Sequence, residues 1–159
     1  MIVNKPSLTE NDMVQQVRAA IYHRASWCYF LVDEARKRGL DWQFAYDAVY
    51  RCGCWHRSLK HDNGNLKEYA QEVFCNDGVM YFEQVLDIRD DEVIVDFHFE
   101  PLVKAWQDMT DDEELIDRLF DIAMAGDFGL FSNPKYKFEV LKRITRGDAV
   151  GKIRITYAE

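Results

Sequence analysis

Apolar residues recur every three to four positions through the first third of the chain, the spacing that keeps one face of a helix apolar. They are Val14, Val17, Ile21, Cys28, Leu31 and Ala35. Ser7 and Glu10 have the spacing of a capping box at the start of this helix, and Gly39 provides its end. A second helix is predicted from Asp41 to Leu59, and a third, shorter helix from Leu66 to Cys75.

The remainder of the chain contains segments whose apolar residues alternate, the period of a half-buried strand. Strands are predicted at residues 84–89, 92–98, 138–145 and 151–157, the last two joined by a turn at Gly147. Pro101 opens a helix between the two pairs of strands. Thr110 and Glu113 predict the capped start of another helix, which is expected to end before a loop at residues 126–134.

Three helices, a hairpin, two helices and a second hairpin predict an α+β fold. N-terminal helices and two antiparallel hairpins would then form a sheet of about four strands that helices cover. With 159 residues the chain fits one domain, residues 1–159, helical over 7–76 and mixed over 80–159.

The charge of the chain bears on its partners. A formal net charge of −8 and a pI near 5.0 argue against nucleic-acid and anionic-membrane partners, which recruit basic surfaces. There is no long uncharged apolar stretch, and the first residues do not resemble a signal peptide. We therefore expect a cytoplasmic protein without a nucleic-acid or membrane partner, and the sequence is compatible with a homo-oligomer.

Four cysteines fit reduced thiols in that compartment. Cys52, Cys54, His56 and His61 form a cluster in the sequence that invites a metal interpretation. Structural zinc sites use other ligand spacings, so packing and surface roles are favoured, and we expect no metal and no cofactor.

A strand end with acidic and imidazole groups is the first candidate for chemistry. Asp96, His98 and Glu100 alternate, so the sequence predicts that they share one face of the sheet. An imidazole between two carboxyl groups suits proton transfer. The alternative is a solvated polar face, which antiparallel sheets often have.

Four stretches of the sequence resemble the L-2-amino-thiazoline-4-carboxylic acid hydrolase family. They are residues 21–39, 97–106, 121–129 and 144–155, and they follow the family's order along nearly the whole chain. The main departure is at Glu100, because family members typically have cysteine before the Pro-Leu-Val stretch that here begins at Pro101. The resemblance implies the α+β scaffold, and the substitution changes the chemistry.

The resemblance also selects further site residues. It makes Asp127, next to Gly126, a catalytic candidate with His98 and Glu100, where a turn aspartate bonded to its own backbone is the alternative. Substrate-binding candidates are His23, Arg24, Trp106 and Phe128, of which Arg24 would hold a substrate carboxylate. Ion pairing for Arg24 and core packing for the aromatic residues are the alternatives.

The function implied is a hydrolase that opens a small cyclic amidine or thiazoline-type carboxylate by general acid and base catalysis. Glu100 or His98 would be the base, and Asp127 would orient or donate. Two alternatives stay open: a non-catalytic small-molecule-binding protein on the same scaffold, and an isomerase or lyase that acts on a small ring with Glu100 as base.

Overall fold

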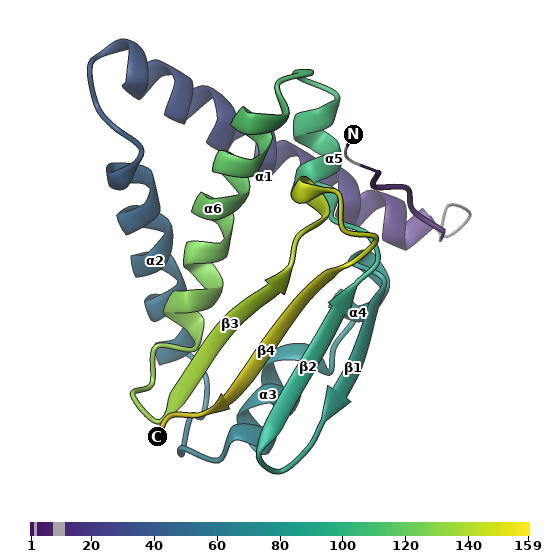
Figure 1. Ribbon diagram of the computed structural model, residues 1–159, viewed down its shortest axis with the longest axis vertical. Helices are drawn as coiled ribbons and strands as arrows, with labels where there is room; N and C mark the ends of the chain where they lie inside the picture. The colour runs from purple at the N-terminus through teal and green to yellow at the C-terminus, as the bar shows by residue number, and fades with distance from the viewer. Residues whose placement is uncertain (2, 8–11) are drawn as a thin grey trace.

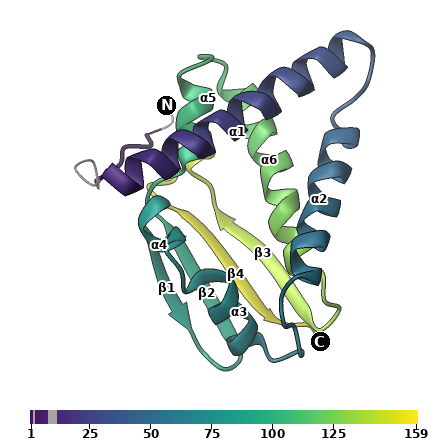
Figure 2. The same ribbon diagram turned by 180° about the vertical axis from the view of Figure 1, so that it is seen from behind.

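A four-stranded antiparallel sheet forms one layer of the protein, and helices cover one of its faces (Figures 1 and 2). The computed structural model describes residues 1, 3–7 and 12–159. The helices are α1 (Asp12–Lys37), α2 (Gln43–Ser58), α3 (Leu66–Phe74), α4 (Gly78–Tyr81), α5 (Pro101–Gln107), α6 (Glu113–Leu130) and the 3-10 turn η1 (Ile144–Arg146). The strands are β1 (Gln84–Ile88), β2 (Glu92–Phe97), β3 (Tyr136–Lys142) and β4 (Gly151–Tyr157). The predicted α+β fold is confirmed.

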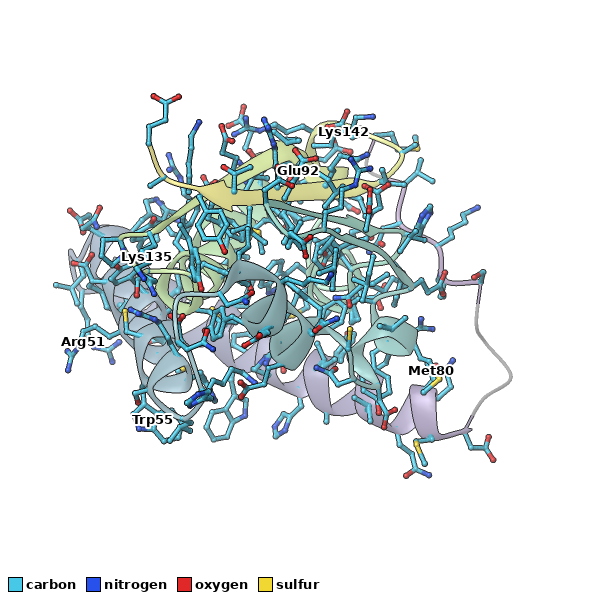
Figure 3. All side chains as sticks on the ribbon, turned by 90° about the horizontal axis from the view of Figure 1, so that it is seen from below. Arg51, Trp55, Met80, Glu92, Lys135 and Lys142 are labelled. Carbon is cyan, nitrogen blue, oxygen red and sulfur yellow. The ribbon has the colours of Figure 1, made fainter. Side chains whose placement is uncertain are left out.

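The strand order is β1-β2-β4-β3, so the two predicted hairpins are joined through β2 and β4. The inner face is apolar, and Val93 and Val95 are fully buried there beside Ile155. The outer face carries cross-strand ion pairs, including Asp96 with Lys152 at 3.0 Å. Glu92 and Lys142 extend from the side of the sheet that faces away from the helices (Figure 3). This contrast between the faces explains why the period-two pattern located the strands.

Two apolar cores lie on the helical side of the sheet. The first lies among α1, α2, α5 and α6, and includes Ala25, Trp106 and Ile122. The second lies between the sheet and α3, and includes Leu66, Tyr69 and Phe131. The N-terminal helices therefore share their core with the second half of the chain.

Helices α2 and α6 touch backbone to backbone at glycines. A Cβ atom on Gly53 would lie 2.0 Å from the carbonyl oxygen of Gly126, and one on Gly129 would lie 2.2 Å from that of Tyr50. The predicted loop at residues 126–134 is wrong for its first five residues, which continue α6 to Leu130. Glycine costs a helix about 1 kcal/mol relative to alanine, but here it permits the close crossing.

Several predicted helix ends differ in detail. The N-cap of α6 is Asp112, which accepts a hydrogen bond from the amide of Leu115 at 3.0 Å, so the box predicted from Thr110 is displaced. The short helix α4 was not predicted. Helix α1 is described from Asp12, and Glu10 of the predicted capping box lies outside the described residues.

Smaller differences concern the last hairpin. Strand β3 begins two residues earlier than predicted and ends at Lys142, and the 3-10 turn η1 follows it. Gly147 has a φ of 88°, as the predicted turn requires.

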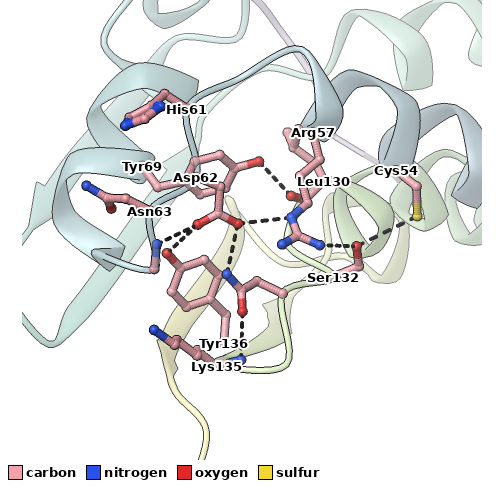
Figure 4. A network of polar contacts seen from close by, with 12 residues as sticks. Cys54, Arg57, His61, Asp62, Asn63, Tyr69, Leu130, Ser132, Lys135 and Tyr136 are labelled. Carbon is pink, nitrogen blue, oxygen red and sulfur yellow. Dashed lines mark hydrogen bonds and ion pairs between the residues drawn. The ribbon is translucent and has the colours of Figure 1, made fainter.

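A buried carboxylate connects the end of α2 to the loop after α6 (Figure 4). The side chain of Asp62 is 5% exposed and accepts hydrogen bonds from Arg57 at 2.9 Å and from Asn133 and Tyr136 at 3.0 Å. Burial by itself would raise the pKa of Asp62, but these bonds and one from the amide of Gly64 outweigh it and hold the pKa below its usual value. The network is structural, because every acceptor site faces a donor of the protein itself.

Candidate functional site

A cavity of about 540 Å³ lies between the two cores. Residues of α1, α2, α3, α5 and α6 line it, together with Gln84 and Phe97, which face each other at paired ends of β1 and β2. Its wall is mainly apolar and includes Val49, Phe74, Leu102, Trp106, Ile122 and Leu130. A cavity of this size and character is typical of a small-molecule site.

Glu100 lines the cavity from the N-cap position of α5, and the residue is 5% exposed. Its backbone is clamped by Asn4, whose side chain accepts from the Glu100 amide at 2.9 Å and donates to the Glu100 carbonyl at 2.8 Å. No hydrogen bond between described residues reaches its carboxyl group. Burial raises the pKa of Glu100 to about 8, and the nearby carboxylate of Asp127 contributes to the increase.

Asp127 lines the same cavity from α6. Its side chain likewise has no hydrogen-bond partner in the described part of the chain, since only its backbone carbonyl accepts a bond, from the amide of Phe131. Burial raises the pKa of Asp127 to about 7, against the opposing effect of the Arg24 guanidinium. Arg24 therefore lies close enough to act on Asp127 electrostatically, and it lines the cavity as well.

The structure thus brings together four of the predicted site residues, namely Glu100, Asp127, Arg24 and Trp106. Trp106 is also a core residue, because its indole N–H donates to the carbonyl of Ala25 at 3.0 Å and the side chain is buried. Asp127 lies within α6 rather than on the predicted loop. Of the glycines beside it, Gly129 is required by the crossing with α2, whereas a Cβ on Gly126 would meet Val49 at 3.4 Å.

The predicted common face of Asp96, His98 and Glu100 is wrong. Strand β2 ends at Phe97, so the alternation stops before His98, which is exposed, while Phe99 and Glu100 are both buried. Asp96 faces away from the cores, where it pairs with Lys152. Neither Asp96 nor His98 is among the residues that line the cavity.

His23 and Phe128 also lie outside the lining of the cavity. His23 is exposed and its ring packs edge-on against Trp27, with centroids 5.5 Å apart. Phe128 packs against Phe138 of β3, with ring centroids 4.9 Å apart.

Sequence reasoning did not assign three residues of the site. His56 and Lys60 line the cavity from the end of α2 and the turn after it. Their spacing continues the helix face that includes Val49, and this was the signal that could have found them. Asn4 has no signal in the sequence, because its contact with Glu100 joins residues 96 positions apart.

The described residues contain no group of three histidine, cysteine or acidic side chains that could hold a metal ion. The four cysteines, all in the described part, are free thiols. Within the same residues, no helix combines the length and the apolar character needed to cross a bilayer.

Fold and site together define an α+β protein with a partly open, mainly apolar cavity that is lined by two carboxyl groups. No protein-family model and no curated protein matches the chain. Among solved structures it is similar to trafficking protein particle complex subunit 3 from Naegleria fowleri, solved covalently bound to palmitic acid. The two are 16% identical over 95% of this chain and 84% of that chain, with a TM-score of 0.41. A likeness at this TM-score supports no conclusion about the ligand of this chain.

Proposed function

We propose that this chain is a hydrolase that opens a small cyclic amidine of the thiazoline-carboxylate type, with Glu100 and Asp127 as its acid and base. One observation carries the proposal: the carboxyl groups of Glu100, which is buried, and Asp127, which is half-buried, share one cavity, and no hydrogen bond from a described residue reaches either of them. Their pKa values, about 8 and about 7, leave one group protonated and the other partly ionised near neutral pH. General acid and base catalysis requires this pairing.

The substrate class follows from the charges. An amidine presents parallel N–H donors, which a carboxylate accepts in the same two-point geometry that it uses for arginine. An apolar wall strengthens such a charge-assisted bond because water is excluded. A cyclic amidine would therefore donate to carboxyl groups that no hydrogen bond from a described residue reaches.

The reaction adds water to the amidine carbon. Asp127, with the lower pKa, accepts a proton from water as the new carbon–oxygen bond forms. Protonated Glu100 donates its proton to the ring heteroatom as the bond between that atom and the carbon breaks. The proton gained by Asp127 then returns to Glu100 through solvent, so no oxidant, reductant or cofactor is needed. These roles replace the sequence prediction that named His98 or Glu100 as base.

The resemblance to the L-2-amino-thiazoline-4-carboxylic acid hydrolase family supports this substrate class. Glu100 occupies the position at which that family typically has cysteine, so the proposed chemistry is proton transfer rather than attack by a thiolate. The free cysteines support a reducing, cytoplasmic location.

The test supplies the purified chain with 2-amino-thiazoline-4-carboxylate and a panel of cyclic amidines, and follows ring opening by mass spectrometry. We expect turnover that falls at least 100-fold in Glu100→Gln and Asp127→Asn. His98→Gln is the matched control and should retain activity, because His98 is exposed and is not among the residues that line the cavity. The proposal would be refuted if the wild-type chain turned over none of the substrates, or if all variants turned them over equally.

A second candidate is a binding protein without catalysis on the same scaffold. It is favoured by the position of Arg24, because the positive charge of Arg24 lowers the pKa of Asp127 and so makes Asp127 a weaker base. Saturable binding of a cyclic amidine without product, together with hydrolysis gained in Glu100→Cys, would support this candidate over the enzyme. Exchange of solvent deuterium into an unopened ring would instead mark an isomerase or lyase.

A further inference from the structure

The cavity has groups of opposite charge at separate places along its length. Glu100 lies where β2 leads into α5, whereas His56 and Lys60 lie at the end of α2 and just after it. The end of α2 lies beside α3, at the opposite end of the sheet from α5, in both ribbon views (Figures 1 and 2). His56 lies in the last turn of α2 and Lys60 two residues beyond its end, and both line the cavity.

Arg24 belongs to the acidic region of the cavity. Its guanidinium lowers the pKa of Asp127, which opposes the effect of burial on that carboxyl group. An anion bound at Arg24 would therefore lie beside the carboxyl group of Asp127, which would repel it. The other basic side chains that line the cavity are Lys60 and His56.

Lys60 retains donors for a ligand. Its ammonium group lies 4.0 Å from the carboxylate of Glu72, outside hydrogen-bond distance, and its side chain is 28% exposed. The other oxygen of Glu72 accepts from the amide of His61 at 3.1 Å. Glu72 therefore offsets part of the charge of Lys60 without saturating its three N–H groups.

The apolar wall between these regions sets the body of the ligand. A volume of about 540 Å³ is in the range that encloses a drug-sized molecule, larger than a single five-membered ring. The apolar lining of the cavity includes Phe74, Ile122 and Leu130.

We infer that the natural ligand is elongated: a basic amidine-like group at Glu100 and Asp127, an apolar body, and a carboxylate at Lys60 and His56. The basic end rests on the proposed function, whereas the anionic end rests on the basic side chains of His56, in α2, and Lys60, just after it. Lys60 is accordingly the residue that determines specificity for a ligand with a terminal anion.

The experiment uses two matched probes, a benzamidine whose para-alkyl chain ends in a carboxylate and the same molecule ending in a carboxamide. Affinities are measured by calorimetry for the wild-type chain, Lys60→Gln, Lys60→Arg and Glu100→Gln. Lys67→Gln is the control, because Lys67 is outside the cavity lining and pairs with Asp90. Thermal melts of each variant establish that it is folded.

We expect the wild-type chain to bind the carboxylate probe at least tenfold more tightly than the carboxamide. Lys60→Gln should abolish this preference, while Lys60→Arg and the control keep it, and Glu100→Gln should weaken both probes alike. Equal affinity of the two probes for the wild type, or a preference that persists in Lys60→Gln, overturns the inference and leaves the proposed function standing. If the preference for the carboxylate probe depends on Lys60 but Glu100→Gln binds both probes as tightly as the wild type, the anionic end of the ligand is supported and the proposed function is contradicted. Failure of both probes to bind overturns both.

Discussion

Replacement of Glu100 by glutamine should stabilise the protein at alkaline pH, although it removes a residue proposed to be catalytic. The pKa of Glu100 is about 8 in the folded chain, against an ordinary value of 4.5. Between these pH values the unfolded chain has lost a proton that the folded protein still holds. Because the unfolded state then binds fewer protons, the free energy of unfolding falls as pH rises through this window.

The magnitude follows from the size of the shift. One pK unit corresponds to about 1.4 kcal/mol, so a rise of the pKa from 4.5 to about 8 gives an upper value of about 5 kcal/mol above pH 8. Glutamine resembles the protonated carboxyl in shape and cannot ionise. We therefore expect Glu100→Gln to match the wild type within about 1 kcal/mol at pH 4.5 and to exceed it by about 2–4 kcal/mol at pH 8.

The assay is urea unfolding followed by tryptophan fluorescence at half-unit intervals from pH 4.5 to 9. Glu114→Gln is the matched control, because Glu114 is exposed in the first turn of α6, and its curve should run parallel to that of the wild type. If Glu100→Gln also runs parallel to the wild type, Glu100 ionises normally in the folded protein and the reasoning about its burial is refuted.

Three further substitutions test the packing and polar contacts around the cavity. Gly129→Ala should lower the free energy of unfolding by about 1–3 kcal/mol or more, because its Cβ would lie 2.2 Å from the carbonyl oxygen of Tyr50. Gly126→Ala places a Cβ at an ordinary 3.4 Å from Val49, so the free energy of unfolding should be unchanged or rise by up to about 1 kcal/mol. Equal effects of Gly129→Ala and Gly126→Ala in urea titrations would contradict the close crossing of α2 and α6. Asp62→Ala should cost about 3 kcal/mol, since it removes the acceptor for Arg57, Asn133 and Tyr136. Because the pKa of Asp62 is lower in the folded protein than in the unfolded chain, Asp62 stabilises the fold above its unfolded pKa, and this stability is lost as pH falls through the folded pKa. The difference in the free energy of unfolding between the wild type and Asp62→Ala should therefore shrink below about pH 4. A difference that stays constant with pH would exclude the hydrogen-bond network of Asp62 as the source of the lost stability. Asn4→Ala should lower the thermal midpoint, because it removes two hydrogen bonds to the buried backbone of Glu100, a loss of about 2–3 kcal/mol in the free energy of unfolding. Asn4→Asp should have an intermediate effect, because it can still accept from the Glu100 amide. Unchanged melting of both variants would show that the contact of Asn4 with Glu100 is not needed for stability.

The alternation of Val93 and Val95 with Glu92 and Asp96 was sufficient to locate β2, because one face of the sheet is buried and the other is charged. The same alternation, extended past the end of β2, wrongly predicted that His98 and Glu100 share a face with Asp96. A period-two pattern holds only while the backbone stays extended, and the chain leaves the strand after Phe97, so His98 and Glu100 have opposite exposures.

Residues 126–130 fail for a different reason. Glycine next to aspartate favours a turn when only local preferences act, and the sequence therefore predicted a loop. In the folded chain, α2 approaches so closely at Gly53 that any side chain larger than hydrogen at Gly129 would collide with backbone. A contact between helices more than 70 residues apart thus outweighs the local preference and carries Asp127 into the cavity on α6.

The sequence alone determined the order of the main helices and strands and the α+β class, because these depend on local period and composition. Glu100 and Asp127 were selected by the resemblance to a known family, not by their local pattern. Only the tertiary structure decided which acids meet in a cavity, which histidines face solvent, and that Asn4 and Lys60 belong to the site. The physical reason is that burial and proximity arise from packing between distant segments, and the pKa of a carboxyl group depends on both.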